Sequence, residues 1–184
     1  CVNDVTNIRD ILMKYFGFAV KDMRVLVDDR ATKAAIMERL AWLVKGAKSG
    51  DRLIFHYSGH GSQVRDRDGD ELKDRMDEII CPYDMDWNGT YITDDELRAV
   101  LGKIPKGVNL EVLLDSCHSG TGTRAAMGLA ALPEELSFVP RFLVPPVDVQ
   151  CRVEDDLVTK RLLAETNPMG HVLFSGCRAN QTSA

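Results

Sequence analysis

One stretch decides the fold of this 184-residue chain: residues 52–61, which read RLIFHYSGHG. The largely apolar run from Arg52 to Tyr57 is followed by a serine and a glycine, and such a run bounded by turn residues is typical of a strand buried on both faces of a parallel sheet. A second stretch has the same design: residues 110–120 read LEVLLDSCHSG. Reactive groups gather past the carboxyl ends of parallel strands, so we expect His60 and Cys117 at one edge of one sheet.

Other segments alternate between helical and strand patterns along the chain. Three helices are expected: one from Asn3 to Phe16, one that begins after Thr32, and one that begins with a capping box at Thr93 and Glu96 and ends at about Leu101. Further strands are expected at Met23 to Val27 and at His171 to Ser175. A polar loop is expected from Gln63 to Asp77, and a long surface excursion over residues 124–170. This alternation predicts an α/β fold, a three-layer αβα sandwich with a mostly parallel central sheet. We expect residues 1–184 to form a single domain. We also expect the chain to be a fragment of a longer protein or a processed subunit.

Composition excludes several classes of protein. A net charge of −5 leaves no basic stripe for nucleic acid, and no apolar run reaches the 18 or so residues that a membrane span requires. Five cysteines, an odd number without a CxxC pair, favour a reduced compartment, so we expect a cytoplasmic protein. Zinc is a weaker use of these cysteines and histidines, because no pair has the close spacing of a structural zinc site.

Cysteine and histidine together favour nucleophilic catalysis. A thiolate attacks far better than a thiol, so Cys117 needs a base nearby, and His60 is the obvious one. The glycine-rich stretch after Cys117 can supply N–H groups to an oxyanion. Two alternatives stay open: Cys117 as a small buried side chain, and His118 as the base, although chain neighbours seldom face each other.

Several motifs together resemble those of the type I metacaspases, within the clan of caspase-like cysteine peptidases. They are YSGHG at 57–61, DSCHSG at 115–120, CVNDV at 1–5, CPYD at 81–84, and the late SGC at 175–177 with QTSA at 181–184. The resemblance implies a caspase-like fold and an endopeptidase with Cys117 as nucleophile and His60 as general base, acting through an acyl-enzyme. It also implies an oxyanion hole formed by the N–H groups of Gly61 and Cys117, and no organic cofactor.

The resemblance further places Asp4 and Asp115 in an acidic pocket for the substrate side chain, with Cys1 and Ser58 near them. Two carboxylates attract a basic side chain and repel an acidic one, which predicts cleavage after Arg or Lys in protein or peptide substrates. Asp4 has the alternative of capping the first helix, and Asp115 that of bonding its own turn.

Calcium is the cofactor that the resemblance implies, with Asp77, Asp94 and Asp95 at matching positions. The nearby loop adds acids at Asp66, Asp68, Asp70 and Glu71. Arg124 stands where some members carry an aspartate, which weakens the expected site. Acids in the first turn of a helix, as at Asp94 and Asp95, are also favoured without a metal. An EF-hand is excluded, because Glu71 occupies the position that requires glycine.

Two further expectations and two alternatives complete this interpretation. The basic, polar loop between Arg124 and Glu165 is a plausible site of self-processing. The resemblance implies a monomer. Two alternatives are a catalytically silent scaffold with the same fold, and another peptidase of the clan, of the legumain or separase kind.

Overall fold

A computed structural model describes residues 1–65, 76–116, 141–150 and 171–175. Its main sheet is parallel and has the order β1 (Arg52–Ser58), β5 (Asn109–Asp115), β6 (His171–Ser175), as the apolar runs predict. The register pairs Ser58, the last residue of β1, with Asp115, the last residue of β5. The chain therefore leaves both strands at the same edge of the sheet.

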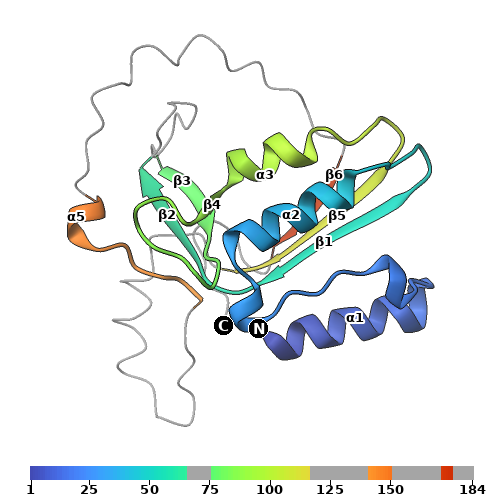
Figure 1. The fold of residues 1–184 in the computed structure, drawn as a ribbon, viewed down its shortest axis with the longest axis horizontal. Helices are drawn as coiled ribbons and strands as arrows, with labels where there is room; N and C mark the ends of the chain where they lie inside the picture. The colour runs from blue at the N-terminus through green and yellow to red at the C-terminus, as the bar shows by residue number, and fades with distance from the viewer. Residues whose placement is uncertain (66–75, 117–140, 151–170, 176–184) are drawn as a thin grey trace.

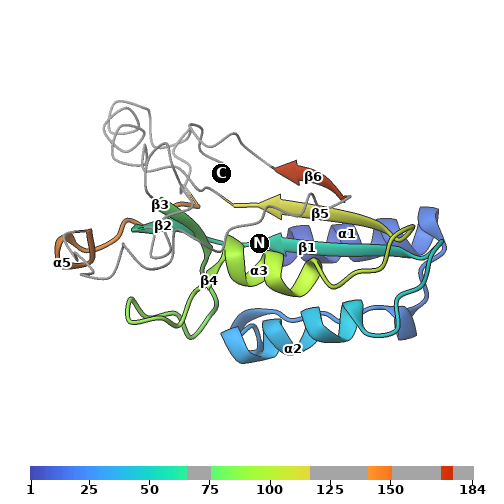
Figure 2. The ribbon, with the colours of Figure 1, turned by 90° about the horizontal axis from the view of Figure 1, so that it is seen from above.

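Helices lie on both faces of this sheet, which gives the expected αβα layers (Figures 1 and 2). One face carries α1 (Val2–Phe16), and the other carries α2 (Lys33–Val44) and α3 (Asp94–Leu101). Gly17 ends α1 in the left-handed conformation, and the hydroxyl of Thr32, at the predicted start of α2, accepts the N–H of Ala35. The fold is therefore the three-layer αβα sandwich that the sequence predicts.

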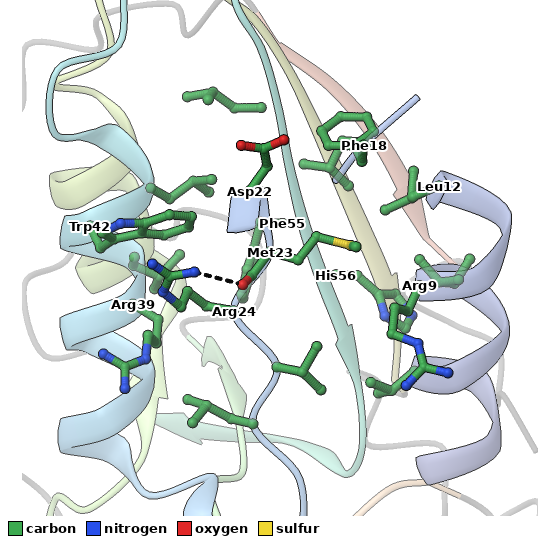
Figure 3. A pocket seen from close by; sticks show the side chains of 18 of the residues that line it. Arg9, Leu12, Phe18, Asp22, Met23, Arg24, Arg39, Trp42, Phe55 and His56 are labelled. Atoms are coloured by element: carbon green, nitrogen blue, oxygen red, sulfur yellow. Dashed lines mark hydrogen bonds between the residues drawn. The ribbon is translucent and has the colours of Figure 1, made fainter. Parts of the chain in front are cut away.

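The strand predicted at Met23 to Val27 is wrong. Two short 3-10 helices, Val20–Asp22 and Asp28–Arg30, flank this segment, whose backbone is extended at both ends but belongs to no sheet. It lines a cavity of about 850 Å³ whose other walls come from β1, α1 and α2 (Figure 3). Apolar residues favour a strand only where a hydrogen-bonding partner lies beside them, and here the cavity separates the segment from β1.

A second, antiparallel sheet was not expected. It contains β2 (Gly61–Arg65), β3 (Met76–Ile80) and β4 (Ile92–Thr93), so the loop predicted from Gln63 to Asp77 is wrong at both its ends. The reason is that polar side chains hide the strand pattern. Ser62 and Asp77 are buried, although their residue types are typical of loops.

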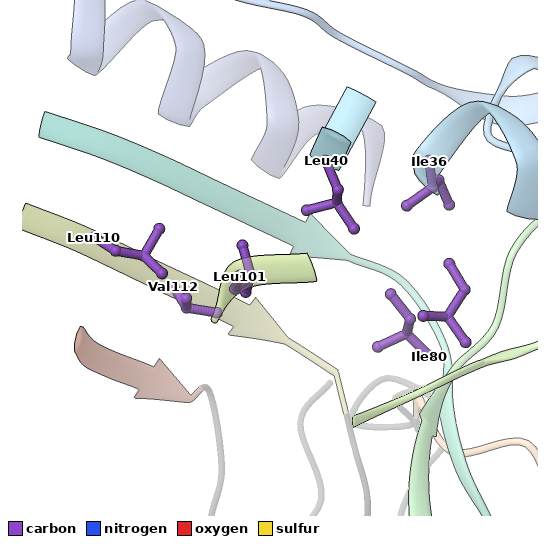
Figure 4. Packing of buried hydrophobic residues seen from close by; sticks show 7 residues of the cluster. Ile36, Leu40, Ile80, Leu101, Leu110 and Val112 are labelled. Atoms are coloured by element: carbon purple, nitrogen blue, oxygen red, sulfur yellow. The ribbon is translucent and has the colours of Figure 1, made fainter. Parts of the chain in front are cut away.

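The main core lies between the parallel sheet and the helices α2 and α3 (Figure 4). Leu40 of α2 and Ile80 of β3 are almost fully buried there, against Leu110 and Val112 of β5. Burial of this apolar area is the main force that holds the layers together.

Residues 141–150 are the part of the expected surface excursion over 124–170 that the structure describes. They include the short helix α5 (Val147–Gln150), and Phe142 and Val149 are buried. The rest of that stretch lies outside the described residues. In the described parts of the chain, no helix has both the length and the apolar character needed to cross a lipid bilayer.

Candidate active site

The edge where β1 and β5 end carries His60, the predicted general base. His60 follows β1 by two residues and its side chain is exposed. The backbone N–H of Gly59 donates to the carbonyl of Asp115 at 3.3 Å, which joins the two strand ends. Cys117 lies outside the described residues; Ser116, directly before it, is fully buried. Because Ser58 pairs with Asp115, positions 60 and 117 each lie two residues beyond a matched pair.

Tyr57 holds the backbone of His60, a role that sequence reasoning missed. Its hydroxyl lies 2.7 Å from the His60 carbonyl and 3.0 Å from the Cys81 carbonyl, and accepts the Cys81 N–H at 3.2 Å. Burial raises the pKa of the Tyr57 phenol, and it raises the pKa of the Cys81 thiol to about 12. Both groups are therefore neutral near pH 7, so the hydroxyl keeps its donor hydrogen.

Asp4, Ser58 and Asp115 come together at the same edge, as the resemblance implies. Their elements are α1, β1 and β5, and the N-terminal end of α1 lies beside the end of β1 (Figure 1). The Ser58 hydroxyl donates to Asp4 Oδ2 at 2.9 Å and lies 3.3 Å from Asp115 Oδ2. We call Asp4, Ser58 and Asp115 the acidic pocket.

The backbone nitrogen of Cys1 also borders the acidic pocket and lies 2.8 Å from Asp4 Oδ2. Hydrogen bonds from this nitrogen, from the Ser58 hydroxyl and from the Arg141 guanidinium hold the pKa of Asp4 well below its usual range, against an opposing effect of burial. Asp4 is therefore ionised at neutral pH and available to a cation.

Arg141 fills the acidic pocket, and sequence reasoning did not identify it. Its Nη2 donates to Asp4 Oδ2 at 2.9 Å and its Nη1 to Ser58 Oγ at 3.0 Å, and the guanidinium also pairs with the Asp115 carboxylate. Burial opposes the charged form, but Asp115 and Asp4 outweigh it and raise the pKa of Arg141. No local pattern marks Arg141, because its partners lie far away in the sequence.

One of the two expected oxyanion donors is described. Gly61 is buried, and its backbone N–H donates to the carbonyl of Arg141 at 2.8 Å. The N–H of Gly61 therefore faces a peptide carbonyl at the edge where His60 lies. The second donor, the N–H of Cys117, lies outside the described residues.

The predicted calcium ligands do not form a recognisable site in the described part of the chain. Asp77 is buried on β3, whereas Asp94 and Asp95 lie in the first turn of α3 and both pair with Arg98. Among residues 1–65, 76–116, 141–150 and 171–175, no group of three acidic, histidine or cysteine side chains could hold a metal ion. The additional acids at Asp66, Asp68, Asp70 and Glu71 lie outside the described residues.

Comparison with known proteins gives one consistent family. Residues 1–125 match the profile of the metacaspase, peptidase C14 domain. Over the whole chain, identity is 34% to metacaspase-1B of Neurospora crassa and 35% to metacaspase-1 of Ajellomyces capsulatus, covering 50% and 59% of those proteins. The chain thus spans about half the length of the curated relatives it matches.

A solved structure with the same architecture is the crystal structure of protein GSU0716 from Geobacter sulfurreducens. It superposes with a TM-score of 0.58 at 31% sequence identity, covering 86% of this chain and 58% of that one. Sequence and fold therefore agree on the relationship.

Proposed function

This chain belongs to the metacaspase family, and from that premise we propose that it is a cysteine endopeptidase that cleaves peptide bonds after arginine or lysine. In this proposal Cys117 is the nucleophile and His60 the general base. The acidic pocket binds the basic side chain on the acyl side of the cleaved bond.

The reaction proceeds in two steps, acylation of Cys117 and hydrolysis of the acyl-enzyme. His60 takes the proton of the Cys117 thiol, and the thiolate attacks the carbonyl carbon while the oxyanion accepts hydrogen bonds from the N–H groups of Gly61 and Cys117. The intermediate expels the amine, which receives the proton from His60, and a thioester remains on Cys117. Water then attacks the thioester, with His60 again accepting a proton, and the carboxylic acid and the free thiol are released.

One observation carries the specificity part of this proposal: the acidic pocket already holds a guanidinium. Asp4, Ser58 and Asp115 surround the side chain of Arg141, whose carbonyl faces the N–H of Gly61. An arginyl substrate presents the same two groups in the same relation. The geometry supports a preference for a planar, bidentate cation, for which arginine suits better than lysine.

A kinetic comparison on basic and neutral reporter peptides tests the proposal. Cys117→Ala should abolish hydrolysis of an arginyl peptide, since no other residue supplies the nucleophile. Asp115→Asn should lower the ratio of kcat/KM for the arginyl peptide to kcat/KM for a norleucyl peptide by about 10- to 100-fold, the loss of one charged hydrogen bond.

Asp10→Asn is a matched control, because Asp10 is an exposed acid of α1 that pairs with Arg9. It should change neither rate. Activity that survives Cys117→Ala would reject the nucleophile, and equal losses on both peptides in Asp115→Asn would reject the acidic pocket.

Four finer properties stay predictions. Calcium activation at Asp77, Asp94 and Asp95 requires the ion to displace Arg98 from Asp94 and Asp95, and the same assay with added calcium or with a chelator tests it. Self-processing between residues 124 and 165 and a monomeric, cytoplasmic protein are proposed on the resemblance alone. A catalytically silent scaffold is the alternative function, and the Cys117 assay also decides that question.

A further inference from the structure

We propose that Arg141 is an internal competitor of the substrate: its own chain presents it to the acidic pocket in the position of a bound substrate arginine. This inference rests on the proposed function, because it names what regulates that same site. Substrate binding then requires the segment around Arg141 to leave the pocket.

The side chain of Arg141 uses the hydrogen-bond acceptors that line the acidic pocket. Its guanidinium donates to Asp4 Oδ2, to Ser58 Oγ, and to the Asp115 backbone carbonyl at 3.1 Å, and it pairs with the Asp115 carboxylate. The side chain is only 13% exposed. A second guanidinium cannot bind these oxygens while Arg141 is present, so the two must exclude each other.

The backbone of the segment lies as a bound peptide would. The Arg141 carbonyl accepts the Gly61 N–H at 2.8 Å, and the N–H of Leu143 donates to the Gly61 carbonyl at 2.9 Å, which gives a parallel bridge between Gly61 and Phe142. Addition of an extended segment to a sheet edge is a general mode of peptide recognition. Arg141 therefore occupies both parts of the site, the acidic pocket and the oxyanion donor.

The residues after Arg141 keep the segment in place. Phe142 is 9% exposed, and the fully buried Ser62 donates its hydroxyl to the Leu143 carbonyl. An occupant tethered in this way has a local concentration far above that of a dilute substrate. The KM measured for an arginyl substrate should then equal the KM of the free pocket divided by the fraction of molecules whose pocket is free.

A structural role is the competing explanation, since Arg141 also links α1, β1 and β5 through Asp4, Ser58 and Asp115. The two explanations predict opposite kinetics. A competitor raises KM and leaves kcat unchanged, so its removal improves binding of the substrate. A structural link supports the site, so its removal weakens binding or lowers kcat.

The test compares the full chain with Arg141→Ala on an arginyl reporter peptide. We expect KM to fall about 10-fold or more, as when one molecule in ten has a free pocket, with kcat within about two-fold. Arg39→Ala is the control, because Arg39 is an exposed arginine that pairs with Glu38, and it should leave KM unchanged. Arg141→Lys, which keeps the charge but not the planar fork, should lower KM by less; it serves if the alanine variant does not fold.

A binding measurement separates this inference from the proposed function. Benzamidine, which mimics the arginine side chain, is titrated by calorimetry into Cys117→Ala with and without Arg141→Ala. Tighter binding in the double variant supports the competitor even if the protein hydrolyses nothing, in which case only the peptidase assignment fails. Hydrolysis of arginyl peptides with KM and benzamidine affinity unmoved or worsened by Arg141→Ala would overturn the competitor and leave the peptidase assignment intact.

Discussion

Gly59 lets the ring of Tyr57 lie against the loop that carries His60. A methyl group at position 59 would come within 2.5 Å of the Tyr57 hydroxyl oxygen and 2.7 Å of the ring carbon that bears it. These distances are too short for any real contact, and the ring is held by its hydrogen bonds to His60 and Cys81. The glycine before His60 is therefore a packing requirement of this site.

Gly59→Ala should consequently displace Tyr57 and damage the site. We expect a loss of about 1–3 kcal/mol in the free energy of unfolding, typical of overpacking, together with lower kcat for an arginyl peptide. Urea unfolding and steady-state kinetics measure the two effects.

A double-mutant cycle identifies the cause. In the background of Tyr57→Ala the methyl group has no ring to strike, so Gly59→Ala should cost much less there than in the parent protein. An equal cost in both backgrounds would show that the clash with Tyr57 is not the reason for the glycine.

At this scale the sequence predicted those residues whose motifs are local. The glycines around His60 and the acids near the strand ends pointed to the edge of the sheet, and the structure places Asp4, Ser58 and Asp115 there together. Arg141 could not be found, because it meets Asp4 only through a contact across 137 positions of the chain. Tyr57 could not be found either, since its strand position resembles that of any buried aromatic residue.

The start of α3 is determined by residues close together in the sequence. In α3 the Thr93 hydroxyl accepts the Glu96 N–H at 3.1 Å and the Glu96 carboxylate accepts the Thr93 N–H at 3.1 Å, which is the predicted capping box. Glu96 also pairs with Lys33 of α2 at 2.8 Å. The cap thus fixes the start of α3 and its position against α2.

Thr93→Ala should lower the free energy of unfolding by about 1 kcal/mol, because the N–H of Glu96 loses its acceptor. Thr6→Ala is the matched control: the Thr6 hydroxyl bonds the Val2 carbonyl within α1, an interaction that adds little, and alanine is the better helix former. Urea denaturation of both variants provides the comparison. A loss in Thr93→Ala no larger than that in Thr6→Ala would contradict the capping role.

Elements that depend on distant partners were predicted less well. The residues from Met23 to Val27 have strand propensity, yet a cavity lies between them and β1. Conversely, Gly61–Arg65 is polar in composition but pairs with Met76–Ile80, and this pairing buries Val64 and Ile79. Whether a segment forms a strand depends on the partner strand beside it as much as on its own sequence.

At the scale of the whole molecule, the layers bring one reactive edge together from distant parts of the chain. The start of α1, the ends of β1 and β5, and the segment at Arg141 meet there, and the large cavity beside β1 adjoins it at Cys1 and Ser58. The alternation of helices and strands was sufficient to predict these layers. It was not sufficient to predict that the acidic pocket would be filled by the chain itself.

The most direct test of the central claim is the site of reaction with a peptide that ends in an arginyl chloromethyl ketone. We predict one adduct by intact mass, mapped to Cys117, a slower reaction in His60→Ala, and a far slower one with the norleucyl analogue. Cys81 should not react, because burial raises the pKa of its thiol to about 12. Labelling of another cysteine instead of Cys117, or equal rates with the arginyl and norleucyl reagents, would contradict an arginine-directed cysteine peptidase.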